Sequence, residues 1–310
     1  MMEASRSGLT ANLTAVTLQA REGAADWRDY LTLTKPRIMS LLILTAVCAM
    51  IASAGGSPPP VALMALVVGG GLACGGASAL NHVLDRDIDR LMGPRTASRP
   101  VAAGRISPRR ASAFGVTLSI LSFLVMVRFD NLLAAALALA GGIFYVLVYT
   151  RLLKRATPQN IVFGGAAGAI PPLSGWAAAH GSLGLGALYL FLIVLIWTPP
   201  HFWALAMLIA PGYAAAEVPM MPVVRGQEAT ARQIFGYSAA LTAVTLLPGL
   251  TGTFSSLYLL SAMVLDAVFL VLAVRLWRRT SDRRAAVLFH YSLLYLALLF
   301  VAVAVAEAMA

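Results

Sequence analysis

Nine stretches of this 310-residue chain are long and apolar enough to cross a lipid bilayer, which takes about 20 residues of helix. Only 12% of the residues are charged, about half of the roughly 25% that soluble domains carry. We therefore predict an all-α integral membrane protein with nine transmembrane helices. The predicted spans cover residues 38–55, 61–82, 112–128, 131–150, 160–179, 185–210, 234–254, 257–276 and 285–308.

The lysines and arginines of the chain lie almost entirely on one side of these spans. Of the 23 basic residues, 22 fall before the first span or in every second loop, and Arg128 is the exception. Because basic residues in short loops stay on the cytoplasmic side of a membrane, we predict a cytoplasmic N-terminus, an outer C-terminus and long loops that face the cytoplasm. Orientation explains the net charge of +10 without nucleic-acid binding, which needs a basic soluble face.

The chain is predicted to have two parts. Residues 1–34 contain four acidic residues and no continuous apolar segment, which argues against a signal peptide, so we expect a cytoplasmic tail there. Residues 35–310 are expected to form one transmembrane domain in the cytoplasmic (inner) membrane of a bacterium. Because the opposite-side connections are short and nearly uncharged, we expect the active site to face the cytoplasm.

Three oxygen-bearing side chains recur at a spacing of four where the second span ends. Asn81, Asp85 and Asp89 drift by only about 40° per step on a helix, so they share one face, whereas Asp87 points to the other side. Two carboxylates and an amide offer the hard oxygen ligands that Mg²⁺ prefers. We predict that Asn81, Asp85 and Asp89 bind Mg²⁺. The alternative without a function is a solvated loop whose acids pair with nearby arginines.

Groups that commonly hold phosphate follow this motif and recur in the loop after the fourth span. Forked guanidinium donors suit phosphate oxygens, and Gln159 and Asn160 begin the fifth span, where the helix N-terminus favours anions. A plain cytoplasmic anchor is the alternative for the basic residues of that loop. The predicted phosphate contacts are Arg95, Thr96, Arg99, Lys154, Arg155, Gln159 and Asn160. The residues assigned catalytic roles are Asp85, Asp89, Arg95 and Lys154.

The chain resembles a known family over nearly its whole length. The pattern NxxxDxxxD at the end of a second span is similar to the UbiA superfamily of intramembrane prenyltransferases. The resemblance narrows to the protohaem IX farnesyltransferase (haem O synthase) family through the segments "LTKPR", "KRATPQNIVFGGAAGA" and "WTPPHFWALA". It implies a UbiA-type helical bundle over residues 35–310.

The resemblance also implies a reaction. The farnesyl group of farnesyl diphosphate would join a vinyl group of haem B with addition of water, giving haem O and diphosphate. Mg²⁺ is the implied cofactor, and haem B is a substrate rather than a cofactor. The lipid bilayer surrounds the protein, and haem A synthase or assembly factors of haem–copper oxidases are the candidate protein partners.

Two positions depart from the family's pattern. The family usually has one residue between the Met and the Arg-Thr of the first motif, whereas "MGPRT" has two. After the sixth span the family often has an acid directly before the tyrosine, whereas Gly212 precedes Tyr213 here. A second metal site is therefore expected to be weakened, moved onto the nearby acid Glu217, or absent, and Glu217 is the candidate ligand.

Further candidates lie within or beside the fifth and sixth spans. His201, Trp203 and Tyr213 are predicted substrate contacts; the ordinary alternative for His201 is a hydrogen bond to a neighbouring helix. The proline pairs at 171–172 and 199–200 are expected to break their spans at depth, which is tolerated where the backbone lines a cavity. We expect the active-site cavity there.

Three other functions compete with haem farnesylation. A UbiA-type prenyltransferase acting on an aromatic or quinone-precursor acceptor would carry the same metal motif. A non-catalytic haem chaperone would not need Mg²⁺. A transporter would place polar residues at the membrane midplane, whereas the charges here lie at one surface except for Asp266. That buried acid is predicted either to function or to bond neighbouring helices.

Overall fold

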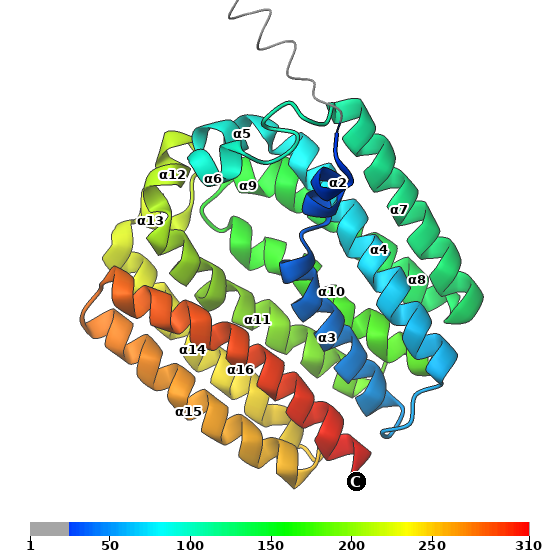
Figure 1. Ribbon diagram of the computed structural model, residues 1–310. Helices are drawn as coiled ribbons and strands as arrows, with labels where there is room; N and C mark the ends of the chain where they lie inside the picture. Colours follow the sequence, from blue (N-terminus) through cyan, green and yellow to red (C-terminus); the bar gives the residue numbers. More distant parts are fainter. Residues whose placement is uncertain (1–24, 310) are drawn as a thin grey trace, which may run out of the picture.

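The computed structural model describes residues 25–309, and within that range the regular secondary structure is helical (Figure 1). Nine spans in the described part are long and apolar enough to cross a membrane, which confirms the predicted number. The spans are α3 (Pro36–Ser53), α4 (Pro60–Leu84), α7 (Pro108–Phe129), the continuous α8, η1 and α9 (Leu132–Ala156), α10 (Asn160–His180), α11 (Leu185–Leu208), α14 (Gly226–Leu250), α15 (Ser256–Arg278) and α16 (Asp282–Ala308).

The largest difference from the predicted spans is at the seventh. Its helix α14 begins at Gly226 rather than at residue 234, because the polar segment before the apolar run continues the same helix. Most of the predicted tail, residues 1–24, lies outside the described residues. Its last part forms α2 (Trp27–Thr34), which packs against α4.

Short helices gather at one end of the bundle, and that end carries the basic loops (Figure 1). The chain leaves the long helices there to form compact turns rather than extended loops. These short elements are α5 (Arg86–Leu91), α6 (Pro94–Ala97), α12 (Ala210–Ala215) and α13 (Met221–Val224). They place the polar residues that follow α4 and α11 at the same end of the molecule.

The buried acid Asp266 joins three helices in the core. Thr245 on α14 donates a hydrogen bond to one of its carboxyl oxygens at 2.6 Å, and Tyr295 on α16 donates to the other at 2.6 Å. Buried polar groups are tolerated when they are hydrogen-bonded in this way. Of the two predicted roles of Asp266, the structure supports the interhelical one.

The proline pairs do not break their helices, so this expectation is wrong. Residues 171–172 lie inside α10, and residues 199–200 lie inside α11. Proline has a fixed φ near the helical value, and what it removes is one N–H donor. The carbonyls that lose a backbone partner in α11 are those four residues before each proline, Leu195 and Ile196, and the helix continues through both positions.

Candidate active site

Asn81, Asp85 and Asp89 share one buried face, as their spacing predicts. The helix α4 ends at Leu84, and Asp85 lies between it and α5 with φ −91° and ψ 3°. Backbone bonds from Asp85 N–H to the Asn81 carbonyl (2.9 Å) and from Asp89 N–H to the Asp85 carbonyl (2.8 Å) continue the helical pattern across this junction. The Asn81 amide donates to Asp85 Oδ2 at 2.8 Å, so the side chains also contact one another.

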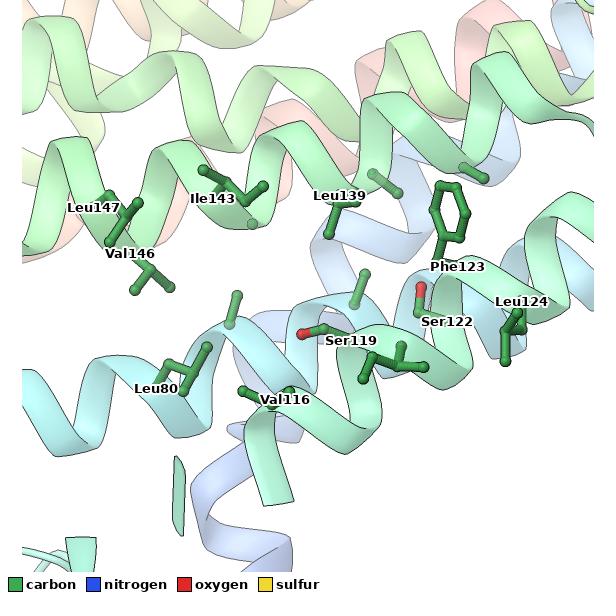
Figure 2. Close-up of a pocket in the computed structure, with 16 residues that line it drawn as sticks. Leu80, Val116, Ser119, Ser122, Phe123, Leu124, Leu139, Ile143, Val146 and Leu147 are labelled. Atoms are coloured by element: carbon green, nitrogen blue, oxygen red, sulfur yellow. The ribbon is translucent and has the colours of Figure 1, made fainter. Parts of the chain in front are cut away.

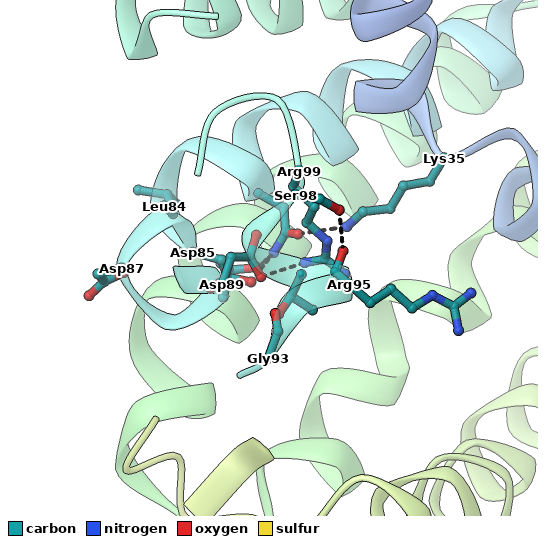
Figure 3. A network of polar contacts seen from close by, with 12 residues as sticks. Lys35, Leu84, Asp85, Asp87, Asp89, Gly93, Arg95, Ser98 and Arg99 are labelled. Atoms are coloured by element: carbon teal, nitrogen blue, oxygen red, sulfur yellow. Dashed lines mark hydrogen bonds and ion pairs between the residues drawn. The ribbon is translucent and has the colours of Figure 1, made fainter. Parts of the chain in front are cut away.

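Three cations from separate parts of the chain converge on this face, and Figure 3 shows two of them, Lys35 and Arg99, beside the aspartates. The contacts are Lys35 Nζ to Asn81 Oδ1 (2.8 Å), Lys154 Nζ to Asp85 Oδ2 (2.6 Å) and Arg99 Nη1 to Asp89 Oδ1 (2.5 Å). Lys154 and Arg99 are among the predicted residues. Lys35 is not; it lies between α2 and α3 in the left-handed backbone region, with φ 50°. The sequence feature that could have identified Lys35 is the segment "LTKPR", which contains it and is one of the segments that resemble the family.

Burial shifts the pKa values of charged groups in this cluster and leaves two carboxylate oxygens without a hydrogen bond. Burial, with Arg99 and Lys154 nearby, lowers the pKa of Lys35 to about 7 although two acids favour its charged form. Burial raises the pKa of Asp89 in spite of its bond to Arg99. Asp85 Oδ1 and Asp89 Oδ2 are buried and accept no hydrogen bond from the described residues. Such unpaired oxygens are costly, so the site fits a metal cation at these two oxygens and an anion beside its three cations.

The other predicted basic residues do not reach this face. Arg155 binds Asp87 through two nitrogens, both at 2.7 Å, on the opposite side of the motif. Arg95 is exposed, and its guanidinium points away from the aspartates (Figure 3). The Thr96 hydroxyl donates to the Gly93 carbonyl at 3.0 Å within its own turn. Their contact with phosphate therefore stays a prediction without support from this geometry.

The two polar residues at the start of α10 differ in burial. Asn160 is fully buried and donates from its amide to the Thr157 carbonyl at 2.6 Å, while its Oδ1 has no partner among the described residues. Gln159 is half-buried at the cap position of the helix, and no side-chain hydrogen bond caps that helix end. A role for either in binding phosphate stays a prediction.

A π-helical segment places Lys154 at the site. Between α8 (Leu132–Ile143) and α9 (Lys154–Ala156), the chain forms the π-helix η1 (Phe144–Leu153). Tyr145 and Lys154 are nine residues apart, which is two and a half turns of an α-helix and would put them on opposite faces. With i→i+5 hydrogen bonds and about 4.4 residues per turn, nine residues complete about two turns. Both residues then share the face of η1 from which Thr150 accepts the Asn81 amide at 3.0 Å.

Aromatic rings line the same region. Tyr145 and Tyr149 stack with ring centroids 5.7 Å apart, on the same segment η1 that carries Thr150, the hydrogen-bond partner of Asn81. Tyr213 is buried on α12, and burial raises the pKa of its hydroxyl. Tyr213 is a predicted substrate contact, whereas the sequence analysis did not single out Tyr145 and Tyr149.

The two positions that depart from the family's pattern, the longer "MGPRT" turn and Gly212 before Tyr213, are in contact with each other. A Cβ atom at Gly212 would be 2.5 Å from the Met92 carbonyl oxygen, so the turn that holds the additional residue leaves no space for a side chain there. Glu217 is exposed, with φ 53°. No three His, Cys, Asp or Glu side chains of the described residues gather into a metal site, so the structure does not bring Glu217 to Asp85 and Asp89.

An apolar cavity of about 430 Å³ lies between α4, α7, α8 and η1 (Figure 2). Ala77 and Val146, which line it, are each four residues before a member of the hydrogen-bonded pair Asn81 and Thr150. The cavity therefore ends one helical turn from the polar site. It does not lie at the proline pairs of α10 and α11, where the sequence placed the active-site cavity.

The predicted substrate contacts on α11 are packed among other side chains. His201 Nδ1 lies 2.7 Å from the Ser292 hydroxyl on α16, and its ring stacks between Trp197 (4.2 Å) and Phe289 (5.0 Å). This is the interhelical hydrogen bond that was the alternative to substrate contact. Trp203 is fully buried, and its indole N–H has no partner among the described residues. Contact of either side chain with a substrate stays a prediction.

Replacing Lys35 by glutamine should lower kcat/KM for the diphosphate substrate about tenfold or more, because hydrogen bonds to charged groups contribute about 1.5–3 kcal/mol. The change keeps a hydrogen-bond donor near Asn81 but removes one of three cations. Steady-state kinetics on membranes with equal amounts of protein would measure it. Replacement of the exposed Arg37, two residues away, is the control; an equal loss in both variants would contradict a specific role for Lys35.

The chain matches known proteins over most of its length. The family described as "UbiA prenyltransferase family" matches residues 41–305. The protoheme IX farnesyltransferase of Thermus thermophilus is 50% identical over 286 residues, which are 92% of this chain and 47% of that protein. The chain thus spans about half the length of that relative. The same-named proteins of Gloeobacter violaceus (50% identical; 91% of this chain, 92% of the relative) and Azotobacter vinelandii (46%; 94% and 97%) match nearly end to end.

Solved structures share the fold at low sequence identity. The structure of a digeranylgeranylglyceryl phosphate synthase has a TM-score of 0.75 and 18% identity, over 91% of this chain and 99% of that one. A UbiA homologue from Archaeoglobus fulgidus bound to GPP and Mg²⁺ has a TM-score of 0.61 and 16% identity, over 89% and 99%. At these identities the likeness establishes the helical architecture alone.

Proposed function

Because this chain belongs to the UbiA prenyltransferase family, we propose that it transfers the farnesyl group of farnesyl diphosphate to a vinyl group of haem B, giving haem O and diphosphate. The choice of haem rests on the names of its relatives, two of which match nearly end to end. The single observation that carries a diphosphate substrate is the convergence of Lys35, Arg99 and Lys154 on a face with two unpaired carboxylate oxygens.

Asn81, Asp85 and Asp89 would hold Mg²⁺. When bound, the ion acts as a Lewis acid that neutralises the leaving diphosphate. Without it, Lys154 and Arg99 pair with the two carboxylates. Acids that pair with a metal ion need these cations less, so we infer that the ammonium and guanidinium groups then turn to the diphosphate oxygens. In a buried site, such fixed charges stabilise developing negative charge strongly.

The transfer needs no covalent bond to the enzyme. The bond between farnesyl C1 and the diphosphate oxygen breaks, and the diphosphate keeps the electron pair. The vinyl group of haem B supplies the electrons of the new C–C bond, and the positive charge moves to the vinyl carbon next to the porphyrin. Water adds its oxygen there and releases one proton. The stacked rings of Tyr145 and Tyr149 would stabilise the allylic cation through their electron-rich faces.

The apolar parts of the substrates belong in the membrane. The cavity below Asn81 and Thr150 is apolar and offers a place for part of the farnesyl chain. We place the site at the cytoplasmic face of a bacterial inner membrane, with the N-terminus inside, the C-terminus outside and residues 1–34 as a tail. The support for this orientation is the position of 22 of the 23 basic residues on that side.

An acceptor assay tests this function. Membranes containing the chain are incubated with labelled farnesyl diphosphate, Mg²⁺ and either haem B or an aromatic quinone precursor. We expect label in haem O with haem B, none with the aromatic acceptor, and loss of product when the divalent ion is chelated. Labelled product from the aromatic acceptor alone would replace haem with that acceptor, and haem bound without any diphosphate release would favour a chaperone.

A further inference from the structure

A cleft of about 630 Å³ lies between the end of α15 and the start of α16. The turn from α15 into α16, which carries lining residues of this cleft, is at the end of the bundle that has the short helices (Figure 1). None of its residues belongs to the polar site described above. The lining residues are Leu272, Arg275, Arg279, Thr280, Ser281, Arg283, Arg284 and Val287.

The arginines of this cleft are not neutralised. Arg284 is used structurally, because its Nη1 donates to the Arg279 carbonyl at 2.6 Å and caps the end of α15. The side chains of Arg275, Arg279 and Arg283 form no ion pair with any described residue. The acid of this turn, Asp282, is exposed and pairs with none of them. Three guanidinium groups around one hollow repel one another and favour an anion.

The cleft also has two apolar lining residues that continue into an exposed apolar surface of α15. Leu272 and Val287 are these residues, and Val271 and Val268 on α15 are exposed on the surface that continues along the span, away from the end with the arginines. Trp277, in the same last turn of α15 as Arg275, is half-exposed and stacks on Phe235 of α14, with centroids 4.7 Å apart. Tryptophan favours the depth of the lipid headgroups. The arginines are therefore at headgroup level, directly above an apolar surface.

We propose that this cleft binds one anionic phospholipid of the leaflet on the side of the polar site. Its phosphate contacts Arg275, Arg279 and Arg283, and one acyl chain lies along Leu272 and Val287. Basic pockets between transmembrane helices commonly recognise such headgroups. A free phosphate would satisfy the arginines but leave the apolar floor open to water, whereas a phospholipid covers both.

Native mass spectrometry of the full-length protein tests this. The delipidated protein in detergent is titrated with phosphatidylglycerol or phosphatidylcholine, and binding is compared among the wild type, R279Q/R283Q and the control R109Q/R110Q. The control removes two exposed, unpaired arginines from the same side of the membrane. We expect one tightly bound phosphatidylglycerol in the wild type and control, at least about tenfold weaker binding in R279Q/R283Q, and weak binding of phosphatidylcholine throughout.

Several results would overturn the proposal. Equal losses in R279Q/R283Q and R109Q/R110Q would mean that phosphatidylglycerol responds only to overall charge. Displacement of the lipid by millimolar inorganic phosphate, or one-for-one by haem B, would assign the cleft to a free anion or to the substrate. The lipid-free melting temperatures should agree, because the side chains of Arg279 and Arg283 form no ion pair with the described residues; a clear drop in R279Q/R283Q would show a structural role instead.

Discussion

Replacing Asp85 by asparagine should lower the proposed formation of haem O by at least about 10³-fold, whereas replacing Asp87 by asparagine should leave it within about twofold. Both changes keep the side chain's size and remove one carboxylate from the same motif. Asp85 is 1% exposed, binds Lys154 and has an unpaired oxygen toward the site. The Asp87 side chain is 59% exposed and pairs with Arg155 at the surface, where ion pairs contribute little.

The measurement is the conversion of haem B to haem O in membranes that contain equal amounts of each variant. Mg²⁺ should be titrated, because the loss of a charged ligand at position 85 should also raise the metal concentration required. Similar activity of the Asp85 variant and the wild type would remove the metal assignment. An equally large loss in the Asp87 variant would mean that the face of the helix does not separate the two acids.

Spacing along one helix predicted the aspartate face because the relevant geometry is local. Asn81, Asp85 and Asp89 stay aligned although α4 ends at Leu84, since backbone bonds bridge the junction. The nine spans were predictable for a similar reason: each must satisfy its own backbone inside lipid, so length and apolar composition define it. Where the physics is contained within one segment, the sequence is sufficient.

The tertiary part of the site was harder to predict. Lys35 reaches Asn81 from 46 residues away through a left-handed turn, and its position before the first span does not distinguish it from the neighbouring basic residue Arg37. The absence of an acid before Tyr213 is explained by contact between Gly212 and Met92, a packing relation between loops 120 residues apart. Such contacts depend on how helices meet, and no single-segment pattern contains that information.

Adjacent basic residues illustrate the same limit. Lys154 and Arg155 look equivalent in sequence, yet Lys154 binds Asp85 inside the site and Arg155 binds Asp87 outside it. The wide turns of η1 decide which of the two faces inward. A π-helix is rare and often found at functional sites, so an ordinary helical projection assigns the wrong angular positions beyond it.

Substitution of Lys154 is the second change with a large expected effect on catalysis, and substitution of its neighbour Arg155 is the control. Lys154→Gln should lower kcat for haem O formation about 10²–10³-fold, comparable to the loss of one donor that stabilises developing negative charge, with a smaller change in KM for farnesyl diphosphate. Arg155→Gln should change kcat less than about threefold.

Because Lys154→Gln also leaves the Asp85 carboxylate without its cation, the variant should lose stability. Melting temperatures measured with saturating Mg²⁺, which supplies a replacement cation, separate that loss from the kinetic one. A rise in KM for farnesyl diphosphate with unchanged kcat would show that Lys154 contributes only to binding of the substrate in its ground state. Equal effects of the two substitutions would contradict the orientation that η1 gives to Lys154 and Arg155.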